Sequence, residues 1–279
     1  MRIFEKKADI NTALLACKKR SETIGFVATM GALHQGHVSL IKQAKNETKI
    51  VVCSIFVNPT QFNDKKDLER YPRPIEEDKK MLAEAGCNIL FLPSVEEMYP
   101  EPDTRVFDFD NLDKVMEGAR RPGHFNGVAQ IVSKLFETVM PDKAYFGQKD
   151  FQQQTIIRAL VKQLSLSVEI VACPIVREEN GLAMSSRNKL LSVEERGKAG
   201  FIHQELLKAK ELIKRISPEE VKEKIKEDFL EGRLFSFEYF EIADIETLSP
   251  VKKITKEKSA IACIAVKLGN VRLIDNIFL

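Results

Sequence analysis

Two of the chain's four histidines lie three residues apart in the stretch TMGALHQGHVSL, residues 29–40. His34 stands between Gly31 and Gly36, and His37 directly follows Gly36, shortly after the apolar run IGFVA. Glycines at such points allow a tight turn and a close approach of the backbone to a ligand. Histidines in this setting can bind a metal, act as the base of a nucleophile, or hold an anion.

A helix is expected after this turn, because His37 shares one helical stripe with Leu40 and Ala44. His34 then lies near the helix N-terminus, where free N–H groups and the positive end of the helix dipole suit phosphate. Imidazole N–H groups add donors that can stabilise charge developing on phosphoryl oxygens. Two alternatives remain open: a pair of capping or core histidines, and a metal pair that lacks an obvious third ligand nearby.

Three further polar residues stand in turns that follow or precede regular elements. Gln61, in FVNPTQF, comes after a strand-like run, and its amide can hold a hydroxyl or a carboxylate. The alternative is a plain turn set by Asn58 and Pro59. Arg121 and His124 flank a Pro-Gly turn in RRPGHFNGV, where arginine suits carboxylate or phosphate recognition. The alternative there is a loop with a surface arginine.

The segment AYFGQKDFQQQ, residues 144–154, opens a helix after a short strand. Lys149 can reach phosphates at that helix start. Asp150 is either a site residue or a simple N-cap, with Gln153 at the third helical position. Gln153 also lies four residues before Ile157 on the apolar stripe. Its inward-facing amide therefore needs a partner, either a polar ligand or a backbone group.

Strand-like and helix-like segments alternate over the first 175 residues. The expected strands are short and continuously apolar, as in strands buried on both faces. They are residues 23–28, 50–57, 88–92, 144–146 and 168–173. Helical spacing links them, as from Val128 to Val139 and from Ile157 to Leu164. The alternation predicts an α/β fold over residues 1–175, with a Rossmann-like doubly wound parallel sheet.

The remaining residues, 176–279, predict a smaller C-terminal α+β domain. Ser192 and Ser217 each stand three residues before a glutamate, which is a capping-box signature and predicts two helices. The runs FSFEYFEIAD, SAIACIAVKLG and NVRLIDNI predict three strands, with a tight hairpin at Gly269 and Asn270.

The composition disfavours several classes of protein. The 279 residues are 44% apolar, which argues against disorder, and no apolar run approaches the roughly 18 residues of a membrane helix. The N-terminus lacks the apolar segment of a signal peptide, so a cytoplasmic location is expected. The net charge of +2 disfavours a nucleic-acid partner. Five cysteines without a CxxC pair indicate reduced, mostly buried thiols and argue against a zinc site.

Six motifs together resemble one known family. TMGALHQGH resembles the HIGH-type signature of the nucleotidyltransferase superfamily, and MSSRN resembles the KMSKS-type loop that closes over ATP phosphates in those enzymes. With NPTQF, YPR, RPGHF and GQKDFQQ, they occur in the order and spacing of the pantothenate synthetase family, over residues 25–190. The chain departs from the family pattern at Ala28, Gln35 and Asn126, where proline, glutamate and arginine are usual. These departures bear on substrate affinity rather than on reaction type.

The resemblance implies that pantoate and β-alanine are joined with ATP and Mg²⁺, through pantoyl adenylate, to give pantothenate, AMP and pyrophosphate. His34, His37, Lys149 and Arg187 are then the catalytic residues that face the phosphates. The implied ATP site comprises Met30, Gly31, Ala32, Leu33, His34, Gln35, Gly36, His37, Gly147, Gln148, Lys149, Asp150, Val176, Met184, Ser185, Ser186 and Arg187. The implied pantoate and β-alanine site comprises Gln61, Gln153, Arg121 and His124.

The family also implies how the rest of the molecule serves this reaction. Mg²⁺ is held mainly by the ATP phosphates, so no protein residue is assigned to it. The C-terminal domain acts as a lid that closes about a hinge near residues 174–180, which shields the mixed anhydride from water. A homodimer is expected from the family alone.

Three other functions remain open at this stage. A different HIGH-type nucleotidylyltransferase shares the first and last motifs but does not require NPTQF or KDFQQ. A nucleotide-binding regulatory protein would bind ATP without turnover. A nucleic-acid-binding protein of the same ancestry is disfavoured by the near-neutral charge.

Overall fold

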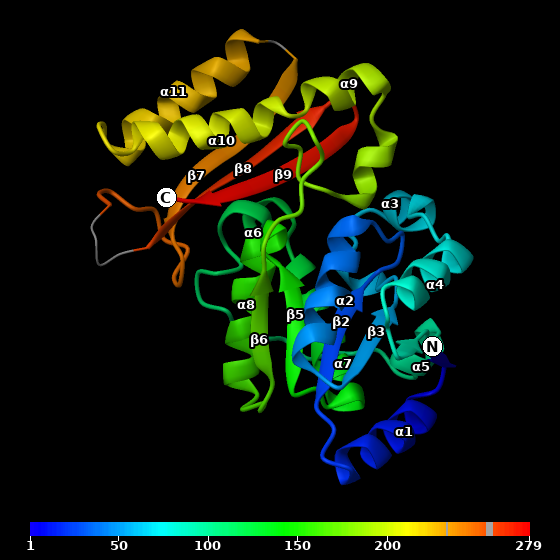
Figure 1. Cartoon of the computed structure of the whole chain (residues 1–279). Coiled ribbons are helices and arrows are strands. Elements are labelled where there is room, and N and C mark those ends of the chain that lie inside the picture. The colour runs from blue at the N-terminus through cyan, green and yellow to red at the C-terminus, as the bar shows by residue number, and fades with distance from the viewer. Residues whose placement is uncertain (233, 255–258) are drawn as a thin grey trace.

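The computed structural model describes residues 1–232, 234–254 and 259–279. Two sheets organise these residues: a six-stranded sheet within residues 2–173 and a three-stranded sheet within residues 235–278. The small sheet lies across one end of the large sheet (Figure 1). No helix in these ranges is both long and apolar enough to cross a membrane.

The six strands of the large sheet are all parallel, in the order β1-β4-β3-β2-β5-β6. They are β1 Arg2–Phe4, β2 Ile24–Thr29, β3 Ile50–Ile55, β4 Ile89–Phe91, β5 Lys143–Gly147 and β6 Glu169–Cys173. The predicted strands are confirmed to within two residues at each end. The edge strand β1 is not among them, because its short run shows no pattern. The strand order reverses between β2 and β5, which is where such sheets bind ligands.

Helices cover both faces of the large sheet. The longer ones are α1 Lys7–Lys19, α2 Gln35–Glu47, α4 Ile75–Glu84, α7 His124–Val139 and α8 Phe151–Gln163. The shorter ones are α3 Lys65–Arg70, α5 Val95–Met98 and α6 Met116–Arg120, with the 3-10 turns η1 Pro59–Gln61 and η2 Gln148–Asp150. Phe26 of β2 packs in the core of α1, α7 and α8, whereas Val27 packs in the core of α2 and α4. Adjacent residues of one strand thus face opposite helical layers, which confirms the doubly wound fold.

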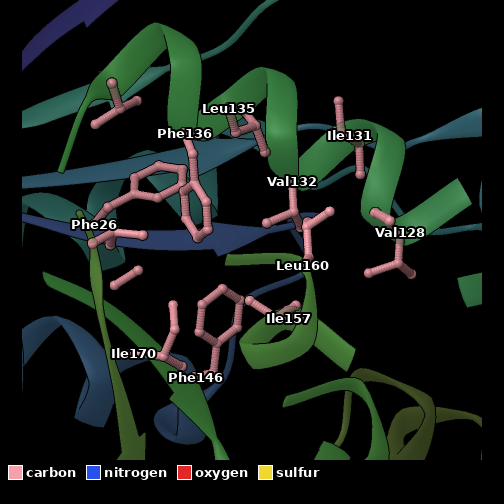
Figure 2. Packing of buried hydrophobic residues seen from close by; sticks show 14 of the residues in the cluster. Phe26, Val128, Ile131, Val132, Leu135, Phe136, Phe146, Ile157, Leu160 and Ile170 are labelled. Carbon is pink, nitrogen blue, oxygen red and sulfur yellow. The ribbon is translucent and has the colours of Figure 1, made fainter. Parts of the chain in front are cut away.

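Helix α7 supplies much of the larger core (Figure 2). Phe136 meets Phe26 edge to face with ring centroids 6.2 Å apart, and it meets Phe146 of β5 at 6.5 Å. Val128 and Val132 continue the same buried stripe toward the start of the helix. The stripe predicted from the sequence therefore faces the sheet, and its packing fixes where the first turn of α7 lies.

The small sheet is antiparallel and consists of β7 Phe235–Asp244, β8 Ala260–Leu268 and β9 Val271–Phe278. Before it come the 3-10 turn η3 Ser186–Leu190 and the helices α9 Val193–Lys198, α10 Phe201–Leu212 and α11 Pro218–Glu231. Both predicted capping boxes are present, at Ser192 and Ser217. The pairing of Leu268 with Val271 confirms the tight hairpin. The predicted α+β arrangement is therefore confirmed, with α10 and α11 against the outer face of the sheet (Figure 1).

Polar contacts hold the small sheet against the carboxyl end of the large one. Arg272 of β9 donates two hydrogen bonds to the Glu117 carboxylate of α6, at 2.6 and 2.7 Å. The Tyr239 hydroxyl donates to the same carboxylate at 2.8 Å. The Asn276 amide donates to the carbonyls of Gln148 and Lys149, at 2.9 Å each. The two sheets thus meet through residues that adjoin the functional loops.

The five cysteines are all unpaired and buried, as predicted. Burial raises the pKa of the Cys87 and Cys173 thiols to about 11. These side chains therefore act as small apolar groups of the core.

Candidate active site

A cavity of about 280 Å³ opens at the carboxyl ends of β2, β3, β5 and β6. It lies beside the reversal of strand order between β2 and β5. The starts of α2, α7 and α8 contribute to its wall, and the small sheet contributes Tyr239 and residues 274–276. The predicted motifs converge on this cavity, because they follow parallel strands whose carboxyl ends share one edge.

The histidine pair begins helix α2. His34 is the N-cap, and its Nδ1 accepts a hydrogen bond from the N–H of Gly36 at 3.1 Å. His37 accepts through Nδ1 from the N–H of His34 at 3.3 Å. The imidazoles therefore form a capping box in place of the usual serine and glutamate. The capping alternative is therefore correct, and because both rings also line the cavity, with centroids 4.1 Å apart, it does not exclude the site interpretation.

The capping bonds fix the proton position on both rings. An Nδ1 that accepts a hydrogen bond carries no proton, so the neutral imidazole carries its proton on Nε2. Burial lowers the pKa of His34 to about 4, and the Lys149 ammonium adds to this effect. Burial and the neighbouring His34 lower the pKa of His37 to about 3. At pH 7 the rings are neutral, and each offers one N–H donor.

The loop between β2 and α2 satisfies its own N–H groups. The N–H of Gly31 donates to the Thr29 hydroxyl at 3.2 Å. The N–H groups of Ala32 and Leu33 donate to the Asp78 carboxylate of α4, at 2.8 and 2.7 Å. These three loop N–H groups are therefore occupied by protein partners. The predicted free N–H groups belong to the helix N-terminus itself, where the N–H of Gly36 already donates to His34 and the two imidazoles offer further donors at the cavity.

Gln61 ends the 3-10 turn η1, so the predicted turn and the predicted site residue coincide. Its amide oxygen accepts from the Asn58 amide at 3.2 Å, and its amide nitrogen lies 2.9 Å from the Met30 sulfur. The Asn58 carboxamide oxygen accepts in turn from the Tyr99 hydroxyl at 2.8 Å. This chain of contacts sets the orientation of the Gln61 amide at the cavity wall.

His124, the first residue of α7, has the opposite tautomer to the capping pair. Its Nδ1 lies 2.9 Å from the backbone carbonyl of Gln61 and must donate to it, which leaves Nε2 as an acceptor. Burial lowers the pKa of His124 to about 4, and the nearby Arg121 guanidinium contributes. The cavity thus combines two imidazole donors with one imidazole acceptor.

Arg121 lines the cavity and is half-buried, so the alternative of a surface arginine is wrong. In the described part of the chain its guanidinium has one hydrogen-bond contact, 3.5 Å from the Gln61 carbonyl. Burial lowers the pKa of Arg121, although the Glu117 carboxylate opposes this shift. A buried cation with spare donors is suited to a carboxylate or phosphate ligand.

Lys149 and Asp150 lie between β5 and α8, where their charged groups are 3.2 Å apart. Burial alone would raise the pKa of Asp150, but the Lys149 ammonium outweighs it and the pKa is lowered. Asp150 stands at the N-cap position of α8 without a capping bond from its side chain. The N-cap alternative is therefore right about the position and wrong about the hydrogen bond.

Three successive glutamines in α8 differ in their partners. The Gln152 amide binds the backbone of Leu112 and Val115, and the Gln154 amide donates to the Phe146 carbonyl. Gln153 lines the cavity and has no side-chain hydrogen bond within the described ranges. Of the two partners considered for this amide, the geometry favours a polar ligand.

Val176 and residues 184–187 line the cavity from the segment that follows β6. Arg177 makes a two-point ion pair with Asp275 of β9, at 2.5 and 3.0 Å. Arg187 lies 3.4 Å from the Asp67 carboxylate of α3, and these side chains are 38% and 50% exposed. The start of this segment is thus tied firmly to the small sheet at Arg177, whereas the MSSRN loop meets α3 only through a weak, exposed pair.

The whole chain matches a single family. Residues 2–278 match the model for pantoate-beta-alanine ligase. The chain belongs to this family. The pantothenate synthetase of Porphyromonas gingivalis ATCC 33277 is 54% identical over 277 residues, covering 99% of each chain. That of Bacteroides thetaiotaomicron is 50% identical, covering 99% of this chain and 98% of the other. The chain is accordingly a ligase of pantothenate biosynthesis.

Solved structures of the family share the fold. The pantothenate synthetase of Thermus thermophilus is 43% identical, with a TM-score of 0.91 and 99% of each chain covered. The pantoate–β-alanine ligase of Francisella tularensis, solved in complex with β-γ ATP and β-alanine, is 34% identical. Its TM-score is 0.80, over 99% of this chain and 97% of the other. The resemblance found in the motifs is therefore confirmed along the whole chain.

Most residues that the family motifs mark for the site line the cavity. They are Met30, His34, Gly36, His37, Gln61, Arg121, His124, Gly147, Lys149, Asp150, Gln153, Val176, Met184, Ser185, Ser186 and Arg187. Gly31, Ala32 and Leu33 are buried behind the loop, and Gln35 is exposed. Gln148 contacts Asn276 instead. These last residues support or flank the site rather than face the cavity.

Several cavity residues escape prediction from the sequence. Asn58 is expected only as a turn residue, and Tyr71 only as part of the YPR motif, yet both line the cavity. Glu117 and Asn276 carry no local signal, because their partners lie far away in the sequence. A charged residue inside a helix indicates a solvated face until the tertiary partner is known.

The departures from the family pattern have different structural settings. Ala28 lines the cavity, and Gln35 is exposed at the start of α2. The Asn126 carboxamide accepts from the N–H of Phe107 at 2.9 Å and donates to the carbonyl of Arg105 at 3.1 Å. Asn126 therefore anchors an extended segment and is not part of the cavity wall.

Proposed function

We propose that the chain condenses pantoate with β-alanine through a pantoyl-adenylate intermediate, with ATP as co-substrate and AMP and pyrophosphate as products. The observation that carries this proposal is the convergence of phosphate-directed donors and carboxylate-directed groups in one cavity. Two imidazole donors and two cations lie beside the half-buried Arg121 and the Gln153 amide, which has no hydrogen-bond partner among the described residues. The ATP-analogue and β-alanine complex of the Francisella relative supports the choice of ligands.

In the first half-reaction, the pantoate carboxylate attacks the α-phosphate and pyrophosphate leaves. The protein's task is to position the groups and to stabilise charge on the phosphoryl oxygens. His34 and His37 serve as neutral N–H donors from Nε2. A pKa of about 3 leaves His37 without the proton that a general acid needs at pH 7. His37 therefore acts as a charge-stabilising donor rather than as an acid.

Lys149 and Arg187 supply positive charge to the phosphates. Each is held in the free site by one carboxylate, Asp150 or Asp67. Such partly exposed pairs contribute about 0–1 kcal/mol, so a phosphate readily takes over the cation. Arg187 lies on the rim, where it neutralises charge on the departing pyrophosphate.

Pantoate fits the opposite part of the cavity. Gln61 and Gln153 hold its hydroxyl and carboxylate groups, and His124 offers an acceptor through Nε2. Phe56 and Val128 form an apolar surface that suits the dimethyl group of pantoate. Arg121 is placed to bind a carboxylate of either acid substrate.

A magnesium ion fits this site as a companion of the nucleotide. No group of three potential ligands gathers within the described residues. Two lining carboxylates, Glu117 and Asp275, are held by arginines, whereas Asp150 is held only by lysine. Mg²⁺ commonly takes one carboxylate and completes its shell with phosphates and water. Asp150 would hold the ion, which would neutralise the phosphates when bound.

In the second half-reaction, the β-alanine amine attacks the pantoyl adenylate and AMP leaves. Water must be excluded meanwhile, and we assign this task to residues 176–279 as a lid over the domain formed by residues 1–175. Because Arg177 is fixed to β9, a hinge is best placed at Pro174 to Val176, in the first part of the expected segment.

Two further expectations stay predictions. The family resemblance predicts a homodimer, which sedimentation of the purified chain would test. The composition predicts a cytoplasmic location, which fractionation of the source cells would test.

The decisive experiment is pantoate-dependent exchange of labelled pyrophosphate into ATP, with Mg²⁺ and without β-alanine. Exchange that requires pantoate would demonstrate reversible adenylate formation. A folded protein that binds ATP but shows no exchange would contradict the proposed half-reaction. Exchange driven by another carboxylic acid would instead reassign the acid substrate.

A further inference from the structure

Asp78 is a buried carboxylate that the proposed reaction does not use. It lies in the first turn of α4 and is 1% exposed. Its two oxygens accept the N–H groups of Ala32 and Leu33, at 2.8 and 2.7 Å, and it forms no ion pair within residues 1–232, 234–254 and 259–279. Burying such a group is costly, so its two backbone bonds must offset the loss of water.

The bonds to Asp78 fall where the loop has an unusual backbone conformation. Gly31 and Ala32 are both left-handed, with φ of +79° and +51°. For alanine this conformation is disfavoured by roughly fivefold to thirtyfold relative to the right-handed one. Two charge-assisted hydrogen bonds are strong enough to overcome that preference. Asp78 thereby determines the path of the loop that leads directly into the His34 cap.

We propose that Asp78 is a positioning residue of the nucleotide site. It acts through the left-handed turn at Gly31 and Ala32, which places the imidazoles of His34 and His37. The inference rests on the proposed function in one respect, which is that residues 30–37 form the nucleotide loop. Asp78 itself contacts no substrate in this proposal.

A role of Asp78 through its charge and a role through loop positioning predict opposite changes in ATP affinity when the carboxylate is replaced by a neutral amide. If Asp78 acts only through its charge, Asp78→Asn removes a repulsion from the ATP phosphates and ATP binds more tightly. If Asp78 positions the loop, the substitution turns an amide NH₂ toward one backbone N–H and breaks one of the two bonds. ATP then binds more weakly, by roughly tenfold to a hundredfold.

The test is calorimetric titration of the full chain with ATP and Mg²⁺, beside thermal unfolding of each variant. Glu77→Gln is the matched control, because Glu77 is an exposed carboxylate on the same helix. We expect its dissociation constant to stay within about twofold of the unsubstituted chain. Unchanged or tighter ATP binding by folded Asp78→Asn would overturn the proposal.

A second substitution tests the mechanism and guards against a folding defect. Ala32→Gly in the Asp78→Asn background removes the alanine preference against the left-handed turn, and we expect it to recover at least threefold of the lost ATP affinity. Gly31→Ala places a Cβ 3.0 Å from the Asp78 carboxylate and 3.0 Å from Ile55, in a left-handed position. It should weaken ATP binding with the carboxylate still present. If Ala32→Gly recovers no ATP affinity and Gly31→Ala binds ATP normally, the positioning role is overturned.

Steady-state kinetics separate this inference from the proposed function. Asp78→Asn should raise the KM for ATP by about tenfold or more while the KM for β-alanine stays within about threefold. A general loss of structure would move both constants. If the unsubstituted chain shows no pantoate-dependent exchange yet binds ATP, the proposed function fails while the ATP titrations still decide the role of Asp78.

Discussion

Two regions of the cavity hold their polar groups in different ways. In the first, which we call the paired region, the capping histidines are half-buried, Glu117 is buried, and all three are bound to protein partners. In the second, the exchangeable region, Lys149 and Arg187 meet single carboxylates that are half exposed. The first region keeps its geometry without a ligand, whereas the second can release its cations to one. The comparison separates groups that shape the site from groups that capture the phosphates.

The largest expected effect comes from breaking the paired region at Glu117. Glu117→Ala leaves the Arg272 guanidinium without its two-point partner, and removing one member of a buried pair costs about 3–5 kcal/mol. Because Arg272 is 26% exposed, we expect about 3 kcal/mol in denaturant unfolding. The double variant with Arg272→Ala should cost less than the sum of the single changes. A loss of unfolding free energy below about 1 kcal/mol for Glu117→Ala would show that Glu117 contributes no more than an exposed ion pair does.

The next effect is on turnover, at His37. His37→Ala removes a neutral donor to the phosphates, and turnover should fall about 10²-fold, or about 2.7 kcal/mol. His37→Gln keeps an acceptor at a position where glutamine completes a capping box, so it should restore stability without restoring turnover. His203→Ala, on α10, is the matched histidine control, with turnover expected within about threefold. Full turnover by folded His37→Ala would show that the residue only caps the helix.

In the exchangeable region, Arg187→Met should act on nucleotide use rather than on stability. Hydrogen bonds to charged groups contribute about 1.5–3 kcal/mol, so kcat/KM for ATP should fall roughly thirtyfold. Unfolding free energy should change by less than about 0.5 kcal/mol, because the pair with Asp67 is exposed. A stability loss as large as that of Glu117→Ala would erase the distinction between the two regions.

The buried imidazoles make stability depend on pH. Burial lowers the pKa of His34, His37 and His124 to about 4, 3 and 4, whereas the unfolded residue titrates near pH 6.5. Below pH 6.5 the unfolded chain binds more protons than the folded chain, so stability is greatest above pH 6.5 and is lost toward pH 4. Each histidine contributes about 1.4 kcal/mol per pH unit to that slope. Unfolding of His124→Asn between pH 7 and pH 5 should show a mean slope smaller by about 1 kcal/mol per pH unit, because the unfolded histidine is only partly protonated near pH 6.5, and an unchanged slope would argue against a neutral buried ring.

The smallest expected effect is at Asp67. Asp67→Asn frees Arg187 from its exposed partner, and stability should change by no more than about 0.5 kcal/mol. The KM for ATP should stay equal or fall slightly, because the guanidinium no longer exchanges one anion for another. A clear rise in this KM would mean that Asp67 helps to place Arg187 for the nucleotide.

Local spacing in the sequence predicts the large sheet, the capping boxes and the residues at the strand ends. His34, Lys149 and Gln153 each belong to a motif that follows a strand, so their convergence can be foreseen from the parallel topology. Asp78 cannot be foreseen, because its partner Ala32 lies 46 positions away and it resembles the other acids of α4. The role of Glu117 cannot be foreseen either, because its ion-pair partner Arg272 lies 155 positions away in the sequence.

The backbone N–H groups of the loop before α2 show a second limit of sequence-based prediction. A glycine-rich turn before a helix indicates that backbone donors exist, but not what occupies them. Here a carboxylate from another helix and a threonine hydroxyl occupy them. Only the tertiary structure reveals these partners, and with them the two imidazoles at the cavity wall.

The burial of all five cysteines has a practical consequence for testing the proposed lid. Thiols shielded in the core, with raised pKa values such as those of Cys87 and Cys173, react slowly with maleimides. A cysteine introduced at Val193, which is 93% exposed, and another at Val106, which is 85% exposed, would be labelled against a silent background. A fluorophore pair at these positions would then report the separation of the two domains during turnover, in the otherwise unmodified chain.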